Sequence, residues 1–419
     1  MRSQEPAPAP STRTGAESPS AELVIVSSGP GELSNWAVPM ARAAAAWAAR
    51  HEVLLTLSLI LPPCQFASGQ EIAFARRQEV FARILGPREC LAIVAGLARF
   101  PAAGPGCLLH LGGDLWYSAT LGRRLGFRAF AYAETMLVRK RAHRFERVLL
   151  PTQALARHLL DDGVPSGRVT VVGDLRVDHL ASVRTRAGEG RGRPRVALLP
   201  GSRRWLVEGV LPMFIEAAAA MRARRPEIEF SLIVSPFLPR ETLADVLAPH
   251  RVALTALGID AVQGDHLAAM ARSDLAITLP GTNTVELAIL GVPMLVAVPL
   301  HRPERIRMEG MAEWLGRIPL LGTAVKTMIA RRLMRRPTLV AWPNREAGRP
   351  IVPELLGHIT AEDIARRALA LLDDRPGLAR TARELRGLYV TPPGVAQRIL
   401  DTMAPHLFPA APRDTAFAR

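Results

Sequence analysis

Lysine is nearly missing from this 419-residue chain, in which Lys140 and Lys326 are the only two. The 53 basic residues are therefore almost all arginines, and they exceed the 38 acidic residues by 15 charges. A charge of this size indicates an anionic partner, such as a polyanion, an anionic lipid surface or a phosphorylated substrate. Nucleotide composition can also enrich arginine, so the charge alone does not choose among these partners.

Aromatic residues and cysteines are also few. Aromatic residues make up 5% of the chain, whereas hydrophobic residues make up 49%. This balance favours helices packed on aliphatic strands over an all-β fold. The three cysteines, Cys64, Cys90 and Cys107, show no metal-ligand spacing. Their odd number and uneven spacing indicate free thiols in a reducing compartment.

Long apolar runs are absent as well. A membrane-spanning helix needs about 20 apolar residues, and the nearest candidate, residues 287–300, is interrupted by Gly291 and Pro293. We therefore expect no membrane span. Residues 1–20 have no apolar stretch behind Arg2, which predicts a disordered arm rather than a secretory signal.

Short apolar segments alternate with helical patterns along most of the chain. Residues 22–28, 106–113 and 195–200 are apolar runs that each lead into a turn and then a helical pattern, and residues 71–85 form a mixed helical pattern. Such alternation predicts an α/β fold in which parallel, doubly wound sheets are covered by helices on both faces.

A Gly- and Arg-rich segment at residues 183–194 divides this pattern into two halves, and the chain is long enough for two domains. We predict an arm at 1–20, a Rossmann-like domain at 21–182, a linker at 183–194 and a second Rossmann-like domain at 195–380. Helices at 381–403 are predicted to cross back to the first domain, before a flexible tail at 404–419. Ligands of doubly wound folds lie at the carboxyl ends of strands, which predicts a site in the crevice between the halves.

Two turns in the first half place polar groups at predicted strand ends. In "VIVSSGPGELSNW", Gly31 allows a ligand to approach the backbone and Glu32 opens the next helix, although a plain tight turn explains the glycines equally well. In "LLHLGGDLWYS", Asp114 follows two glycines. With Leu115 and Trp116 beside it, this carboxylate suits a general base of raised pKa, and equally a cap of the next helix.

The turn "LLPGSRRWLVEG" combines Gly201, Ser202 and Arg203 at the point where a strand passes into a helix. Backbone N–H groups are unpaired at a helix start, and cations placed there favour an anionic ligand. A solvated surface turn is the alternative in so arginine-rich a chain.

A second turn of this kind, "LPGTNTVE", holds Gly281, Thr282, Thr284 and Glu286. Threonine hydroxyls and free N–H groups at a helix start can hold a diphosphate. The alternative for Glu286 is that its charge only complements the helix dipole.

These residues resemble the lipid-A-disaccharide synthases, inverting glycosyltransferases of the GT-B architecture. The likeness lies in "LLPGSRRWLVEGVLPMFIEAA", in "MARSDLAITLPGTNTVELAILGVPMLV" and, most specifically, in "PNREAGRPIVPELLG". The first-half strings "GPGELSNW" and "LGGDLWYSATLGRRLGFRAFAY" are more remote versions. The resemblance spans residues 22–403 and is densest in the second half.

The resemblance implies a role for each matching residue. Asp114 matches the catalytic base that takes a proton from the acceptor hydroxyl, and Arg203 matches the arginine that stabilises the diphosphate leaving group. Glu286 matches the acid that binds the ribose hydroxyls. The other residues implied in UDP-sugar binding are Gly31, Glu32, Gly201, Ser202, Gly281, Thr282, Thr284 and Asn344. Glu32 is the next candidate for the base, but it opens a helix, whose N–H groups are expected to lower its basicity.

The implied reaction moves a sugar, an acylated or N-acetylated glucosamine, from a UDP-sugar to a lipid-linked saccharide in the acceptor-binding first half. No metal and no cofactor are expected, because fixed cations and helix starts supply the positive charge. Two departures leave the acceptor open: Leu206 stands where the family usually has Glu, and "PPCQFASGQE" at residues 62–71 is unlike the synthases. The alternatives are a UDP-N-acetylglucosamine 2-epimerase-like enzyme and a non-catalytic nucleotide-sugar-binding relative.

A basic amphipathic helix is predicted at residues 317–342, where a surface helix packed on its own domain is the alternative. A helix that mixes arginines with apolar residues suits an anionic membrane surface, and a lipid acceptor would have to be reached at such a surface. The predicted membrane contacts are Met328, Ile329, Arg331, Arg332, Arg335 and Arg336. The resemblance implies a cytoplasmic protein on the inner face of the cytoplasmic membrane and leaves a homodimer open. Nucleic acid is not expected as a partner, because the arginines lack interleaved aromatic residues.

Overall fold

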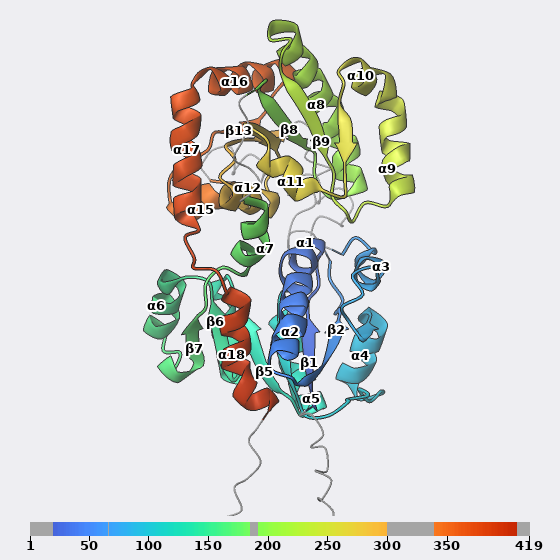
Figure 1. The fold of residues 1–419 in the computed structure, drawn as a ribbon, viewed down its shortest axis with the longest axis vertical. Helices are drawn as coiled ribbons and strands as arrows, with labels where there is room; N and C mark the ends of the chain where they lie inside the picture. The colour runs from blue at the N-terminus through green and yellow to red at the C-terminus, as the bar shows by residue number, and fades with distance from the viewer. Residues whose placement is uncertain (1–19, 66, 185–191, 300–338, 409–419) are drawn as a thin grey trace, which may run out of the picture.

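Two parallel β-sheets, one in each half of the chain, form the framework of the molecule (Figure 1). The computed structural model describes residues 20–65, 67–184, 192–299 and 339–408. The first sheet has the order β3-β2-β1-β4-β5-β6-β7 and the second the order β10-β9-β8-β11-β12-β13. Every pairing in both sheets is parallel. The predicted α/β fold of two doubly wound domains is confirmed.

The strands are short, and most of them coincide with an apolar run of the sequence. In the first sheet they are β1 (Ser20–Val26), β2 (Leu54–Ile60), β3 (Arg83–Leu85), β4 (Gly106–His110), β5 (Arg128–Tyr132), β6 (Arg147–Leu150) and β7 (Val169–Val171). In the second they are β8 (Arg195–Leu199), β9 (Glu229–Ile233), β10 (Asp260–Val262), β11 (Leu275–Thr278), β12 (Met294–Pro299) and β13 (Glu354–Gly357).

Helices cover both faces of each sheet. Those of the first half are α1 (Pro30–Glu32), the π-helical η1 (Leu33–Ala37), α2 (Val38–Arg50), α3 (Glu71–Arg76), α4 (Pro87–Ala95), α5 (Leu115–Leu125), the 3-10 helices η2 (Met136–Arg144) and η3 (Ser166–Arg168), α6 (Gln153–Asp161) and α7 (Leu175–Arg184). Those of the second half are α8 (Arg204–Arg224), α9 (Arg240–Leu247), η4 (Ala248–His250), α10 (Arg251–Ala256), α11 (His266–Ala271), α12 (Asn283–Leu290), α15 (Trp342–Ala347), α16 (Ala361–Asp373), α17 (Arg375–Leu388) and α18 (Val395–Leu407).

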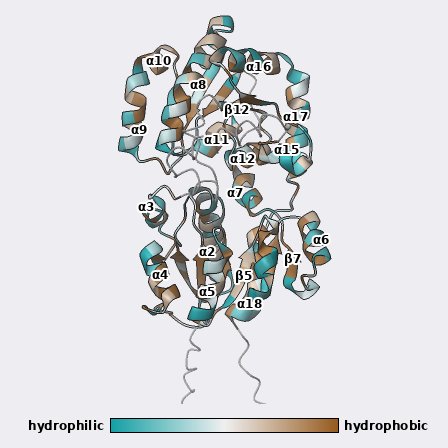
Figure 2. Ribbon diagram, turned by 180° about the vertical axis from the view of Figure 1, so that it is seen from behind, coloured by the Kyte–Doolittle hydropathy of each residue, from teal (hydrophilic) through white to brown (hydrophobic). Residues whose placement is uncertain are grey.

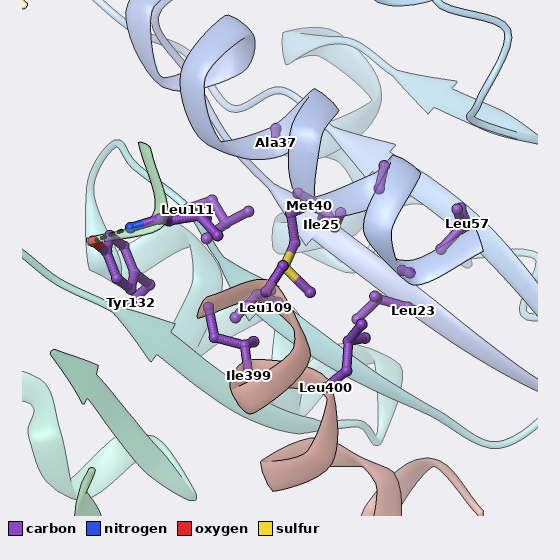
Figure 3. Close-up of a cluster of buried hydrophobic side chains, with 14 of the residues drawn as sticks. Leu23, Ile25, Ala37, Met40, Leu57, Leu109, Leu111, Tyr132, Ile399 and Leu400 are labelled. Carbon is purple, nitrogen blue, oxygen red and sulfur yellow. Dashed lines mark hydrogen bonds between the residues drawn. The ribbon is translucent and has the colours of Figure 1, made fainter. Parts of the chain in front are cut away.

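The central strands are buried on both faces because alternate residues of one strand enter different cores. Leu23 and Ile25 of β1 pack with α2 and α18, whereas Val24 and Val26 pack with residues of α4 and α5. Figure 3 shows the first of these cores, with Met40 of α2 and Leu400 of α18 among the labelled side chains. The outer helices, such as α6 and α17, carry much of the hydrophilic colour in Figure 2. This two-sided burial explains why the strands are continuous apolar runs in the sequence.

The chain passes twice between the domains. Val177 and Leu180 of α7 belong to the core of the second sheet, although α7 directly follows the first sheet. The last helix, α18, returns to the first domain, where Ile399 and Leu400 join its core. Asp178 of α7 accepts hydrogen bonds from the Gly394 and Ala396 N–H groups, each at 2.8 Å. The two crossovers are therefore hydrogen-bonded to each other. The exact domain limits remain a prediction.

The helix predicted over residues 71–85 is wrong in its second half. Helix α3 ends at Arg76, Glu79 adopts a left-handed φ of 53°, and residues 83–85 form the edge strand β3. Pairing of β3 with β2 supplies the hydrogen bonds that a longer helix would have made internally. Sheet pairing is a tertiary effect, which helical spacing in the sequence does not report.

Candidate functional site

The loops at the carboxyl ends of the two sheets meet where the domains face each other, and we call this junction the crevice. The loops after β1 and β4 form its first-domain side, and the loops after β8 and β11 form its second-domain side. The two sides approach closely, because a Cβ atom on Gly31 would lie 3.1 Å from Thr282 Oγ1. The four turns singled out in the sequence therefore meet in one place.

The turn after β1 brings Glu32 into this crevice. Glu32 packs against glycines on both sides, since a Cβ on Gly29 would lie 2.2 Å from Glu32 Oε2 and one on Gly112 would lie 2.5 Å from Glu32 Cγ. Burial raises the pKa of Glu32, and its effect exceeds the opposing effects of backbone N–H groups and of Arg203. The backbone N–H groups do lower the pKa of Glu32, as expected, but desolvation outweighs them, so the net pKa is raised.

Asp114 lies at the exposed end of the turn after β4. It is the N-cap of α5, and its Oδ1 accepts a hydrogen bond of 2.8 Å from the Trp116 N–H. Gly112 and Gly113 reach it through φ angles of 111° and 90°. The capping role that the sequence left open is thus present, and it uses only one of the two carboxylate oxygens.

The turn after β8 places Arg203 at the start of the long helix α8. Arg203 occupies the N-cap position and is half-buried, and it is close enough to Glu32 to lower that group's pKa. Gly201 has a φ of 112°, and Leu206 packs directly over it. Leu206, which stands where the lipid-A-disaccharide synthases usually have Glu, therefore places an apolar side chain against the turn that holds Ser202 and Arg203.

The turn after β11 leads into α12, whose N-cap is Thr282. Thr284 is fully buried, and its hydroxyl donates to the Gly281 carbonyl at 2.7 Å. Thr284 is thus engaged within the turn, while Thr282 lies against Gly31 across the crevice. Glu286, in the first turn of α12, accepts a hydrogen bond of 2.6 Å from Asn35 Nδ2 of the other domain.

Asn344 is fully buried in α15, a helix that packs on α12. Its side chain donates to the Val352 carbonyl and to Glu354, and it accepts from the N–H groups of Ile351 and Val352. These four bonds use the full capacity of an asparagine amide. The structure therefore shows Asn344 fixing the segment between α15 and β13.

A buried ion cluster that the sequence interpretation missed lies at the same edge of the first sheet. Arg176 forms two bonds to Asp174, at 2.9 and 2.7 Å, and a third contact to Glu134 after β5. It also lies over the ring of Trp36, 5.8 Å from its centroid. Burial raises the pKa of Glu134 to about 7, against the opposing effect of Arg176. The signal was present in the sequence, because Asp174 and Arg176 also stand where a strand leads into a helix.

Two other expectations are limited by what the structure describes. Within the described ranges, no three His, Cys, Asp or Glu side chains are placed to hold a metal ion. Among the described helices, none is long and apolar enough to cross a membrane. The predicted membrane contacts, residues 328–336, and residues 185–191 of the predicted linker lie outside the described residues.

Two Rossmann-like domains facing a crevice define the GT-B architecture, and solved structures of that architecture share the fold. A UDP-N-acetylglucosamine 2-epimerase from Listeria monocytogenes superposes with a TM-score of 0.55 at 15% identity, covering 94% of this chain and 98% of that one. The Neisseria meningitidis UDP-GlcNAc 2-epimerase, solved with UDP-GlcNAc bound, gives 0.53 at 12% identity and covers 91% and 99%. At these identities the likeness concerns the fold alone.

Sequence comparison points to a narrower group. Residues 185–302 match the family model described as lipid-A-disaccharide synthetase. The lipid-A-disaccharide synthase of Anaeromyxobacter dehalogenans is 30% identical over 227 residues, which is 52% of each chain. That of Pseudomonas savastanoi pv. phaseolicola is 31% identical over 241 residues, 56% of this chain and 54% of the relative. The chain is thus similar in sequence to the lipid-A-disaccharide synthases over about half of its own length, and the matches span about half the length of those curated relatives.

Proposed function

We propose that this protein is an inverting glycosyltransferase that moves an acylated or N-acetylated glucosamine from a UDP-sugar to a lipid-linked saccharide. The observation that carries the proposal is that a cationic side of the second domain meets an acidic side of the first domain in the crevice. The second domain contributes Arg203 and the N-terminus of α12, and the first contributes the carboxyl groups of Glu32 and Asp114. A cationic side suits a leaving diphosphate, and an acidic side suits activation of an acceptor hydroxyl.

The donor would lie on the second domain. Gly201, Ser202 and Arg203 start one helix and Gly281 and Thr282 start another, so both helix starts would direct N–H groups and partial positive charge at the diphosphate. The carboxylate of Glu286 would accept hydrogen bonds from the ribose hydroxyls. In this arrangement the protein itself neutralises the charge that develops on the leaving group.

The acceptor would lie on the first domain, with its reacting hydroxyl at Asp114. A groove between α4 and α5 begins at Trp116, two residues from Asp114. It is lined by Leu91, Leu97 and Trp116, which are exposed, and by arginines 88, 123 and 124. Apolar side chains ringed by cations suit the acyl chains of an anionic lipid at a membrane surface. This supports a peripheral position on the inner face of the cytoplasmic membrane.

Donor binding tests the proposal through Arg203. UDP should raise the melting temperature of the parent chain, and Arg203→Ala should remove most of that shift. Arg204→Ala is the matched control, because Arg204 is the next residue but is exposed and bonded to Glu208. An equal UDP shift in Arg203→Ala and the parent would remove Arg203 from the site.

A further inference from the structure

The π-helical segment η1 directs one first-domain side chain onto the second domain. Asn35 lies within η1 and is only 4% exposed. Its Nδ2 donates to Oε1 of Glu286 at 2.6 Å, although 251 positions separate the two residues. Single π-helical turns within α-helices occur frequently at functional sites.

Glu286 is a largely buried carboxylate in the first turn of α12. It is 7% exposed, and within the described part of the chain Asn35 is its only side-chain hydrogen-bond partner. Removing a carboxylate from water costs several kcal/mol unless several donors compensate. The first turn of α12 supplies part of that compensation through its dipole. Oε2 is left for donors that a ligand brings, and the vicinal hydroxyls of a ribose are two such donors.

The contact between Asn35 and Glu286 exists only while the domains are together. Beside it, Gly31 of the first domain lies against Thr282 of the second. A third contact across the crevice joins the rings of Phe74 and Phe237, whose centroids are 4.3 Å apart. Opening of the crevice would separate all three pairs and leave Glu286 without its amide partner.

We propose that Asn35 is a positioning residue of the nucleotide site: by holding Oε1 of Glu286, it aims Oε2 at the ribose and completes the site only in the closed arrangement. This inference rests on the proposed function, because it requires a nucleotide on α12. Nucleotide binding and domain closure are then coupled, and each favours the other to the same extent.

The test measures UDP affinity by calorimetry and domain closure by small-angle scattering with and without UDP. Asn35→Ala should weaken UDP binding roughly 10- to 100-fold, the usual range for a hydrogen bond to a charged group, and should enlarge the radius of gyration. Asn35→Asp should weaken binding further, because two carboxylates then face each other. Gln78→Ala, which removes an amide bonded to Arg42 within the first domain, should change neither quantity.

A reversed pair separates positioning from simple interface packing. In the double variant Asn35→Asp/Glu286→Gln, the glutamine amide can donate to the new carboxylate, so the compact radius of gyration should return. UDP affinity should stay low, because the carboxylate for the ribose is gone. Parent-like UDP affinity in Asn35→Ala or in the double variant would overturn the positioning role. A parent chain that binds no UDP would instead overturn the proposed function itself.

Discussion

Two carboxyl side chains on the first-domain side of the crevice have different surroundings. Asp114 is exposed and keeps one carboxylate oxygen outside its helix cap. Glu32 is half-buried against Gly112, and burial raises its pKa. Glu32 also lies close enough to Arg203, the proposed diphosphate contact, for that arginine to lower its pKa. We therefore keep Asp114 as the proposed base and assign Glu32 to donor binding.

Substitution of these two residues gives the residue-scale prediction. Asp114→Asn should keep UDP binding and lose sugar transfer by about 10²- to 10⁴-fold, the usual contribution of a general base. Glu32→Gln should lose less, because the amide can still form hydrogen bonds at the donor site. Initial rates at saturating UDP-sugar measure both. A larger loss in Glu32→Gln, or parent-like transfer by Asp114→Asn, would move the base to Glu32.

Single residues were predictable from the sequence where a local pattern marks them. Gly-rich turns after apolar runs predicted that Asp114, Arg203 and Thr282 follow strand ends, and the structure places them there, although their roles stay predictions. The pairing of Asn35 with Glu286 was not predictable, since it joins distant segments through the packing of two domains. The basicity of Glu32 was misjudged for a related reason, because its burial comes from a glycine on another loop.

At the scale of elements, the turn between β4 and α5 determines how closely the first-domain loops pack. Its two glycines have φ angles that other residues rarely adopt, and neither position has room for a side chain. A Cβ on Gly113 would lie 2.7 Å from Ser28 Oγ, as one on Gly112 would lie 2.5 Å from Glu32 Cγ. The glycine pair thus allows the loops after β1 and β4 to pack closely against each other.

Gly112→Ala tests this requirement. We expect it to lower the free energy of unfolding by about 1–2 kcal/mol through its φ angle, and to displace Glu32 so that transfer falls as well. Gly126→Ala is the matched control, because Gly126 has a φ of 70° but nothing described lies within 4 Å of its Cβ position. The control should lose similar stability in chemical denaturation and retain transfer. Equal transfer by both variants would show that the close packing on Glu32 is dispensable.

The elements themselves were largely predictable because buried parallel strands are apolar runs. The exceptions are elements that depend on contacts rather than on local pattern. The edge strand β3 exists through its pairing with β2, and α7 packs into the second domain after leaving the first sheet. Helical and strand periodicity report which face of an element is apolar, but not which domain that face meets.

For the whole molecule, the proposed function requires residues of both domains at one site. The second domain carries the matched family region, and the first carries the residues that would choose the acceptor. The remote first half and the groove beside Trp116 are therefore where this protein can differ from its relatives. The proposed lipid acceptor is the part of the function that most needs direct identification.

The most direct measurement incubates the pure protein with radiolabelled UDP-sugars and a bacterial membrane lipid extract, and then separates lipid from nucleotide products. We expect a labelled glycolipid whose formation requires Asp114 and Arg203, with release of UDP and inverted configuration at the transferred sugar. Label that stays on the nucleotide as an epimerised sugar would contradict the account and support epimerase chemistry. Label that stays on the unchanged UDP-sugar, across donors and extracts, would contradict transferase activity altogether.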